Sequence, residues 1–426
     1  MNIAVISRST TTHFVSGGME TQLKNLVEGL SDLGHKIFVI TTSYPTEDGI
    51  IKENKNEKIN GVEYFYIGDT TSGLFPLSLI EIPWKAIGFL DRGNKKEGSK
   101  NFFIESLKIF NKQNSMEPFD IIISQSTGAY GIYKDTNLPI ISISHGTITN
   151  EIKNRLKTSK TFKNWTRFLL VDYPKLKLEL QLSNRKFYEQ ISAVVCVSNL
   201  LLKQFLEEYS GIAKSMIKNK SSVIYNGVDA EKFAPGKLSN DKFKLLYVGR
   251  LDKEKGIDLI IRSVSELKSR GYEIYADIVG SGTQESDLKS LTKSLDVLDR
   301  VRFVGPISND NLTQYYNGAN IFVFPSRRIE GQPMTVSESF CCGLPVMSTK
   351  AGGLSEIIED GINGIFIEPE NYLDIADKVQ ALFVNKKRLK KMSKNARISG
   401  LQKFSKVSMA KNYEKLLESL NNGKRK

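Results

Sequence analysis

Two carboxylates within one short stretch of the chain could bind a polar substrate. Glu330 follows an apolar run, Ile321–Phe324, that predicts a strand, and Glu338 lies eight residues later in a predicted helix with Pro333 in its first turn. The end of a parallel strand and the start of the next helix is where open α/β sheets bind ligands. Carboxylate oxygens accept hydrogen bonds from hydroxyl groups, and the free N–H groups of a helix N-terminus favour anions. The pair therefore predicts a site for a ligand that carries hydroxyl and anionic groups.

Two cations and one histidine follow other predicted strands. Arg250 comes directly after the strand predicted at Lys244–Val248, and Lys255 lies five residues further along. An arginine fork can bind two phosphate oxygens and a lysine adds a point charge; two surface cations of a basic protein are the alternative interpretation. His145 directly follows the strand predicted at 139–144, and a lone histidine at a strand end usually has a structural role.

The composition is that of an ordinary globular protein. A chain of 426 residues, of which 40% are hydrophobic and 25% charged, predicts two or three domains. Its start has neither a basic region nor a long apolar run, so we expect no signal peptide, and no run of 18 apolar residues predicts a transmembrane helix. Three cysteines, two of them adjacent, argue against a disulfide framework and fit a reducing cytoplasm. The net charge of +13 fits a solvated lysine-rich surface, an anionic ligand, an anionic membrane face or nucleic acid.

Short strands alternating with helices must position these side chains. Gly17 and Gly18 open the first predicted helix, and Gly34 ends it. Strands are predicted at 2–7, 36–40, 62–67, 121–124, 139–144 and 193–198, and then at 244–248, 274–279, 301–303, 320–324, 344–348 and 364–367. Such short, buried-looking apolar runs are typical of parallel sheets. Each of the two series predicts one doubly wound α/β unit.

The boundary between the two series is expected near Ser222–Asp229, which predicts a strand, a turn and a linker. We expect an N-terminal Rossmann-like domain at 1–215, a C-terminal Rossmann-like domain at 216–400, and a C-terminal helix at 401–426 that returns toward the first domain. Two segments of the first domain depart from the pattern. Residues 73–90 are apolar but interrupted, and residues 151–170 carry six cations among aromatic and aliphatic side chains.

With these residues in place, the chain resembles the family 4 glycosyltransferases, and the resemblance covers nearly its whole length. The residues that carry it are Gly17-Gly18-Met19-Glu20, Asn226-Gly227-Val228-Asp229, Gly249-Arg250-Leu251 with Lys255-Gly256, Gly280-Ser281-Gly282, Phe303-Val304-Gly305, the Glu330/Glu338 pair with Gly343-Leu344-Pro345, and Gly352-Gly353 before Glu356. The resemblance implies the α/β GT-B fold, in which two Rossmann-like doubly wound domains face a central cleft. It also implies that the second domain holds most of a nucleotide-sugar and that the first holds the acceptor.

The resemblance also implies roles for single residues. Glu338 matches the acid that binds the ribose hydroxyls, Glu330 the acid near the C3 and C4 hydroxyls of the donor sugar, and His145 a histidine that contacts the donor sugar or phosphate. Arg250 and Lys255 would meet the negative charge that builds up as the diphosphate departs. The expected catalytic residues are Glu330, His145, Arg250 and Lys255. The expected donor-binding residues are Gly17, Gly18, Arg250, Lys255, Glu330, Gly331, Gln332, Pro333, Met334, Thr335 and Glu338.

The reaction implied by the resemblance is a retaining transfer of a hexosyl group. In the family's usual account the departing phosphate oxygen takes the acceptor's proton on the same face of the sugar. No carboxylate nucleophile is then required, and we do not assign one to Glu330. The expected donor is a UDP-sugar or a GDP-sugar, which is a substrate rather than a cofactor. We expect no cofactor and no metal ion, because no His, Cys or Asp cluster has the spacing of a metal site.

The expected acceptor is a glycan or a lipid-linked acceptor in cell-surface polysaccharide or glycolipid assembly. Because a basic helix with aromatic side chains can lie on anionic lipid, residues 151–170 could bring a cytoplasmic enzyme to the inner face of the membrane. An ordinary amphipathic helix pair is the alternative. No nucleic-acid partner is expected, since only the net charge favours one.

Two other functions fit the same scaffold. A nucleotide-sugar epimerase would need acid and base groups, and the sequence offers none beyond His145. A non-catalytic GT-B protein would be expected to lack Arg250, Lys255 or one of the paired glutamates, and all are present. A dinucleotide dehydrogenase is disfavoured, because Glu285 stands where the Gly-x-Gly-x-x-Gly pattern after Gly280 needs its third glycine.

Overall fold

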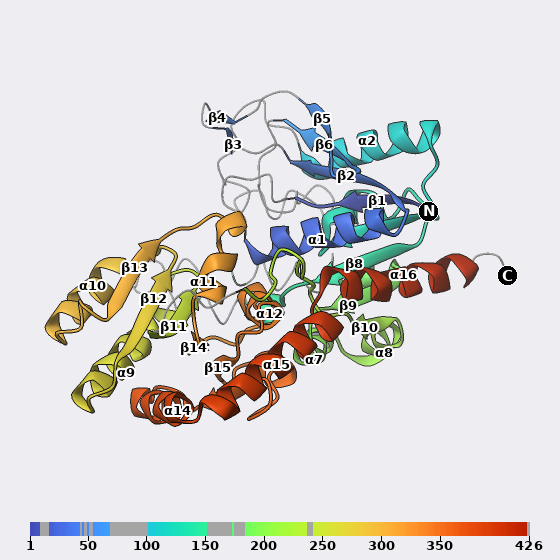
Figure 1. Ribbon diagram of the computed structural model, residues 1–426. Helices are drawn as coiled ribbons and strands as arrows, with labels where there is room; N and C mark the ends of the chain where they lie inside the picture. The colour runs from blue at the N-terminus through green and yellow to red at the C-terminus, as the bar shows by residue number, and fades with distance from the viewer. Residues whose placement is uncertain are drawn as a thin grey trace. The chain divides into compact units, whose positions relative to one another are not determined.

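The computed structural model describes residues 1–8, 17–42, 45–46, 49–50, 54–68, 101–150, 173, 184–236 and 242–423. The chain divides into two compact units (Figure 1), one formed by Met1–Ile224 with Ala410–Lys426 and the other by Tyr225–Met409. The two unusual segments at 73–90 and 151–170 lie outside the described residues.

The first unit is built on an eight-stranded sheet with strand order β10-β9-β8-β7-β1-β2-β6-β5. Its strands pair in parallel except β5, which runs antiparallel to β6 at the edge. The strands are β1 (Asn2–Ile6), β2 (Lys36–Thr42), β5 (Lys55–Ile59), β6 (Val62–Ile67), β7 (Ile121–Gln125), β8 (Ile140–Ser144), β9 (Ala193–Cys196) and β10 (Ser221–Val223), and a separate pair is formed by β3 (Pro45–Thr46) and β4 (Gly49–Ile50). The helices are α1 (Gly18–Asp32), α2 (Phe102–Met116), α6 (Arg185–Gln190), α7 (Asn199–Glu207) and α8 (Gly211–Asn219).

The second unit has a six-stranded, all-parallel sheet with strand order β13-β12-β11-β14-β15-β16. Its strands are β11 (Phe243–Val248), β12 (Ile274–Val279), β13 (Val301–Gly305), β14 (Ile321–Phe324), β15 (Val346–Thr349) and β16 (Gly364–Ile367). Its helices are α9 (Ile257–Ser269), α10 (Glu285–Ser294), α11 (Thr313–Asn317), α12 (Met334–Cys341), α13 (Leu354–Ile357), α14 (Tyr372–Val384) and α15 (Lys386–Lys403), while α16 (Lys406–Gly423) begins here and continues in the first unit. Within this unit α14 packs on α9, and α15 packs on α12 (Figure 1).

The predicted strands of both series are confirmed, with bounds that differ by at most two residues. Both faces of the central strands are covered, and β1 shows the effect: Ile3, Ala4, Val5 and Ile6 are completely buried. A continuous apolar run of this kind suits a strand that is covered on both faces. The apolar side chains collect in one core for each unit.

Each sheet changes winding direction at one place. In the second unit, β11 is followed by β12 and β13 on one side, whereas β14 returns to the other side of β11. In the first unit, β2 lies on one side of β1 and β7 on the other. The loops after β11 and β14 therefore diverge at the carboxyl ends of their strands, where open sheets bind ligands. The carboxyl ends of β1 and β7 form the corresponding place in the first unit.

The structure moves two expected boundaries. The division expected between residues 215 and 216 falls inside α8, whereas the units divide after Ile224. The reason is that β10 pairs with β9 and so completes the first sheet before the chain crosses over. The division expected after residue 400 likewise falls inside α15, and the chain joins the first unit only from Ala410.

Candidate functional site

The loop after β11 is shaped by glycines. Gly249 has a φ of 153° and Gly256 a φ of 72°, and residues with a Cβ rarely adopt these backbone conformations. A Cβ on Gly256 would lie 2.2 Å from the carbonyl oxygen of Pro325, which follows β14. The absence of a side chain thus lets the two loops at the switch point touch. Arg250 and Lys255 lie between these two glycines.

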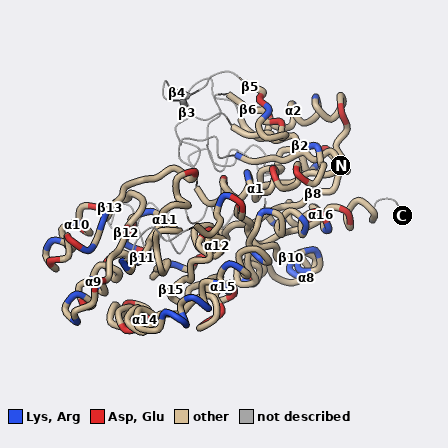
Figure 2. Tube along the Cα trace, viewed as in Figure 1, with Lys and Arg blue, Asp and Glu red and all other residues tan. Residues whose placement is uncertain are grey.

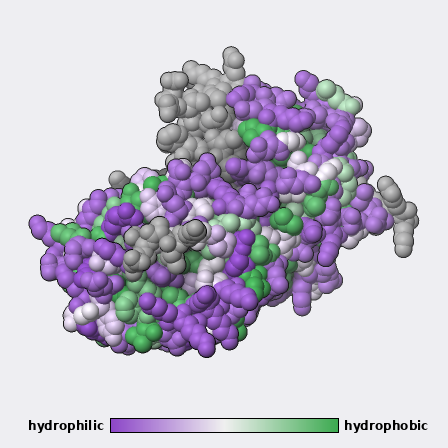
Figure 3. Space-filling view, in the orientation of Figure 1, coloured by the Kyte–Doolittle hydropathy of each residue, from purple (hydrophilic) through white to green (hydrophobic). Residues whose placement is uncertain are grey.

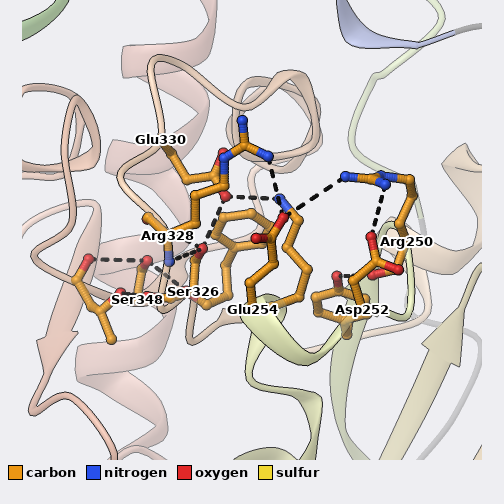
Figure 4. A network of polar contacts seen from close by, with 11 residues as sticks. Arg250, Asp252, Glu254, Ser326, Arg328, Glu330 and Ser348 are labelled. Carbon is orange, nitrogen blue, oxygen red and sulfur yellow. Dashed lines mark hydrogen bonds and ion pairs between the residues drawn. The ribbon is translucent and has the colours of Figure 1, made fainter. Parts of the chain in front are cut away.

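An ion pair joins the two loops. Lys255 Nζ lies 2.7 Å from Glu330 Oε1, and each side chain is only 13% exposed. Ser326 Oγ donates to the same carboxylate oxygen at 2.9 Å (Figure 4). The ammonium group also lies 5.5 Å from the centre of the Phe324 ring, at the end of β14. Two of the expected catalytic residues, 75 positions apart in sequence, are therefore in direct contact.

The backbone of Glu330 is held from its other side. Glu330 forms an isolated parallel bridge with Gly352, and Gly353 N–H donates to its carbonyl oxygen at 2.7 Å. Gly352 has a φ of 70°, and a Cβ there would lie 2.2 Å from the Glu330 carbonyl oxygen. The glycine pair after β15 thus fixes the position of Glu330 by close approach.

Two arginines share one carboxylate beside this ion pair. Arg250, whose side chain is 67% exposed, lies 2.8 Å from Asp252 Oδ2 and 3.9 Å from Glu254 Oε1. Arg328 Nη1 lies 3.2 Å from the same Glu254 oxygen. Figure 4 shows Glu254 between the two guanidinium groups. The site therefore has three cations, Arg250, Lys255 and Arg328, and each is paired with an acid of the protein.

Arg327 fixes the two loops to each other. Its guanidinium binds both oxygens of Asp258 at 2.8 and 2.9 Å and both oxygens of Glu370 at 2.6 and 2.9 Å. It also donates to the Lys253 carbonyl oxygen at 2.7 Å, and its backbone N–H donates to the Glu254 carbonyl oxygen at 2.8 Å. The bond to Asp258 is the largest influence that raises the pKa of Arg327. Sequence reasoning assigned no role to Arg327, Arg328 or Glu254, although two adjacent arginines after a predicted strand were a signal.

Glu338 does not join this network, although it belongs to the same motif as Glu330. It lies in α12 and is only 3% exposed, and Tyr316 donates its hydroxyl to Glu338 Oε2 at 2.7 Å. Burial raises the pKa of Glu338, while the hydrogen bonds from Tyr316 and Asn309 and the charge of Lys232 act in the opposite direction. The two acids therefore occupy different environments: one is ion-paired and the other is buried beside neutral donors and one cation.

The residues that lead into α12 are held by the first residues of the second unit. Asn226 N–H donates to Gln332 Oε1 at 2.6 Å, and Gln332 Nε2 donates to the Asn226 carbonyl oxygen at 3.0 Å and to Ser337 Oγ at 3.1 Å. Both N–H groups of this amide are thus used within the protein, so a donor-binding role for Gln332 would fall to its backbone. Pro333 is the N-cap rather than a first-turn residue, and the helix starts with the N–H groups of Met334 and Thr335.

The first unit presents a neutral set at the ends of its strands. His145, after β8, has Nε2 2.7 Å from Gln125 Oε1 at the end of β7, and Gln125 Nε2 donates to Gln22 Oε1 of α1 at 3.0 Å. Burial lowers the pKa of His145 to about 4, so the imidazole is neutral at pH 7. Nε2 then donates to Gln125 and Nδ1 is left as an acceptor.

The glycines that open α1 lie in the first unit as well. Gly17 is the N-cap, with a φ of −91°, and Gly18 is the first helical residue. Gly17 N–H donates to the carboxylate of Glu20 at 3.0 Å. A phosphate at this helix start would therefore have to displace Glu20.

The structure thus brings Arg250, Lys255 and Glu330 together and keeps Glu338 apart from them within the second unit. His145, Gly17 and Gly18 belong to the first unit. Among the described residues there is no group of three or more His, Cys, Asp or Glu side chains that could hold a metal ion. All three cysteines are buried free thiols. In the described part of the chain, no helix is both long enough and apolar enough to span a bilayer.

Comparison with known families gives two matches that together cover most of the chain. Residues 16–232 match the family described as Glycosyltransferase Family 4, and residues 228–399 match the family described as Glycosyl transferases group 1. The first match alone covers more than half of the chain. The second contains all the charged residues of the loops after β11 and β14.

Three individual proteins illustrate the similarity. The phosphatidylinositol N-acetylglucosaminyltransferase gpi3 subunit of Schizosaccharomyces pombe is 24% identical over 95% of this chain and 78% of its own length. The capsular polysaccharide biosynthesis glycosyltransferase CapM of Staphylococcus aureus is 28% identical over 59% of this chain and 64% of its own length. The solved structure of Anabaena HepE in complex with UDP-glucose has a TM-score of 0.67 and 17% identity, and covers 98% of this chain and all of the other.

Proposed function

Because the chain belongs to the family 4 glycosyltransferases and has the GT-B fold, we propose that it moves a hexosyl group from a nucleotide-sugar to a glycan or lipid-linked acceptor, with retention of configuration. That the protein is a glycosyltransferase follows from its family. The nucleotide-sugar donor, the stereochemistry and the acceptor are the parts that we propose.

The observation that carries this proposal is the set of cations at the switch point of the second sheet. Arg250, Lys255 and Arg328 come from two loops that meet there, and a neighbouring acid pairs with each. Departure of a diphosphate builds negative charge, and fixed cations in a protected site stabilise that charge without reorganisation. A UDP-sugar or a GDP-sugar provides the diphosphate, and the HepE structure, which contains UDP-glucose, supports the choice of a nucleotide-sugar.

In the proposed reaction the bond between the sugar's C1 and the phosphate oxygen breaks, and a bond between C1 and the acceptor oxygen forms on the same face. The acceptor's proton passes to the departing phosphate oxygen, so a nucleoside diphosphate leaves. Glu330 accepts hydrogen bonds from the sugar hydroxyls; its ion pair with Lys255 and its bond from Ser326 make it a poor nucleophile. This agrees with a mechanism in which no carboxylate attacks C1.

The remaining residues would position the donor. Glu338 binds the ribose hydroxyls with the carboxylate capacity that Tyr316 leaves free. His145, held neutral by burial, accepts a hydrogen bond from the donor sugar through Nδ1. The N–H groups at the start of α12 and at Gly18 bind phosphate or sugar oxygens, and the N–H of Gly17 joins them once Glu20 is displaced.

We further propose that the acceptor is lipid-linked and belongs to cell-surface polysaccharide or glycolipid assembly at the cytoplasmic face of a membrane. Two relatives support this: the name of one contains phosphatidylinositol, and the name of the other contains capsular polysaccharide biosynthesis.

The first test is the thermal stability of the protein with UDP, GDP, ADP and their sugars. A ligand at about 100 times its dissociation constant stabilises a protein by about 2.7 kcal/mol, which raises the melting temperature measurably. We expect a rise with one base in the wild type and no rise in Arg250→Ala. If no nucleotide shifts the wild type, the donor site is wrong and a non-catalytic role is favoured.

A further inference from the structure

Helix α15 carries much of the protein's excess positive charge. Its 18 residues, Lys386–Lys403, include eight lysines or arginines and no aspartate or glutamate. The net charge of the whole chain is +13. A single helix with this composition is either a solvated surface or a surface for an anionic partner, and its structure decides between the two.

One face of α15 is fixed against the donor-binding part of the second unit. Gly400 is buried against α12, where an added Cβ would lie 2.7 Å from Cys341 N. Ser393 Oγ donates to the Gly343 carbonyl oxygen at 2.6 Å, and Arg397 donates to the Cys341 carbonyl oxygen. The orientation of α15 is therefore set by α12, the helix that carries Glu338.

The opposite face of α15 combines lysines with aliphatic side chains. Lys387, Lys390, Lys391 and Lys394 are exposed and recur at helical spacing. Further along the same face, Ile398 is 41% exposed and Leu401 is 45% exposed. These six residues are called the α15 face. In Figure 2 basic residues follow α15, and in Figure 3 apolar atoms gather near its C-terminal end.

The four lysines of the α15 face have no acidic partner among the residues that the structure describes. Other lysines of the second unit do pair with an acid, as Lys268, Lys289 and Lys378 show. Lys403, on another side of α15, pairs with Glu359 at 2.8 Å. The α15 face thus combines unpaired positive charge with exposed apolar surface. A partner that is both anionic and apolar would complement the two together.

We propose that the α15 face docks on an anionic lipid surface. The lysines attract the lipid phosphates, and Ile398 and Leu401 enter the boundary between headgroups and acyl chains, as in helices that lie in a membrane interface. Nucleic acid would satisfy the lysines but not the aliphatic pair. The inference rests on the proposed lipid-linked acceptor and names a surface for it in the second unit. A bilayer bound here would lie one helix away from α12.

The test is co-sedimentation with phosphatidylcholine vesicles with and without phosphatidylglycerol. We expect binding only with the anionic lipid. Since one lysine near such a surface contributes a factor of about five to the partition coefficient, replacing Lys387, Lys390, Lys391 and Lys394 with Gln should weaken binding by roughly 100-fold or more. The matched control replaces four exposed lysines elsewhere, Lys289, Lys293, Lys411 and Lys415, with Gln. It makes the same change in net charge and should lose little binding.

The aliphatic pair separates a lipid partner from other polyanions. Ile398→Ser with Leu401→Ser should weaken vesicle binding by about tenfold, whereas Met116→Ser with Leu298→Ser, at two other exposed positions, should not. Equal loss of binding in the two lysine variants would overturn the proposal, because net charge alone would explain it. So would binding to duplex DNA that depends on the four lysines and equals binding to the vesicles.

A second measurement, the melting temperature with the donor nucleotide, separates failure of the α15 proposal from failure of the proposed function. The α15 face contains no residue assigned to the donor site, so the nucleotide-induced rise in melting temperature should be the same in the lysine variant and the wild type. Retained nucleotide binding with no lipid binding in the wild type would overturn the α15 proposal alone. If no nucleotide raised the melting temperature of any of these proteins, the wild type included, the proposed function would be overturned instead.

Discussion

Each of the two sheets of this protein has one switch point, but the side chains there are charged in the second unit and neutral in the first. At the switch point of the second sheet, three cations and their acidic partners come from the loops after β11 and β14. At that of the first sheet, His145, Gln125 and Gln22 form a chain of neutral groups. The fold thus provides a switch point in each unit, and under the proposed function the cations of the second would receive the anion.

A second difference lies in what each set must do when a ligand arrives. The neutral chain of the first unit is satisfied internally and still leaves Nδ1 of His145 as an acceptor. The cations of the second unit are already neutralised by Asp252, Glu254 and Glu330. Under the proposed function, donor binding at the second sheet would be an exchange of anions, whereas binding at the first would add a hydrogen bond to a set that is already paired.

The largest effect is expected from Lys255→Ala, which removes the least exposed of the three cations. The change takes one charge from the diphosphate and leaves Glu330 without its ion pair. Loss of one such group typically lowers turnover by about 100-fold to 1,000-fold. The measurement is kcat/KM with the donor identified by thermal stability. Lys253→Ala, two residues away and exposed, is the matched control, and equal rates in the two variants would remove Lys255 from the site.

The second largest effect is expected on the free energy of unfolding of Gly256→Ala. This variant tests how closely the two loops at the second unit's switch point approach each other. The variant combines a φ of 72° with a Cβ 2.2 Å from the Pro325 carbonyl oxygen. Gly271→Ala is the control, because Gly271 has a φ of 81° but nothing within 4 Å of its Cβ. Left-handed strain alone costs about 1–2 kcal/mol, so we expect Gly256→Ala to lose clearly more in urea unfolding. Equal losses would mean that the loops can separate freely.

Much of the fold could be predicted from the sequence because parallel strands are continuous apolar runs. β5 was missed, since Lys55–Lys58 is polar at the edge of the sheet. The sequence also could not give the strand order, and the order is what places β14 beside β11. The chain between β11 and β14 includes β12 and β13 with their helices, and nothing local shows that it returns to β11.

The candidate site was predictable where a single residue carries a distinct chemistry, as with Arg250, Lys255 and Glu330. Residues whose role depends on a contact with another side chain could not be predicted. Arg327 and Glu254 gain their importance from contacts across the two loops, which depend on the strand order. Gln332 shows the opposite case: it lies in the motif, and the structure adds that its side-chain amide holds Asn226.

The pH dependence of the first unit should follow His145. Its folded pKa of about 4 lies below the unfolded value of about 6.5. The unfolded state therefore binds more protons between these values, and stability falls as pH decreases through that window, by roughly 3 kcal/mol in total. His35 adds to the same trend, because burial and the charge of the N-terminus lower its pKa. Histidine titrations by NMR, with only three histidines to assign, distinguish the two.

Gln125→Glu sharpens the comparison by introducing a charge into the neutral chain. A carboxylate beside Nε2 raises the pKa of His145, by about 1–3 units for a close pair, and so reduces the stability lost on acidification. Gln125→Met, which adds no charge, should leave the pKa low. If His145 titrates near pH 6.5 in the wild type, the first switch point is not a neutral, desolvated set.

The smallest effect is expected from Glu254→Gln, which tests whether donor binding in the second unit is an exchange of anions. Glu254 lies 3.2 Å from Arg328 and 3.9 Å from Arg250, and all three side chains are partly exposed. Exposed ion pairs contribute about 0.2–1 kcal/mol. Arg250 stays paired with Asp252, so the release of Arg328 alone should tighten nucleoside diphosphate binding by up to about fivefold. Calorimetry at low salt measures it, and Glu285→Gln controls for net charge. Weaker binding would mean that Glu254 positions the arginines for the phosphates instead of competing with them, and the contrast between the two sheets would then lie only in charge.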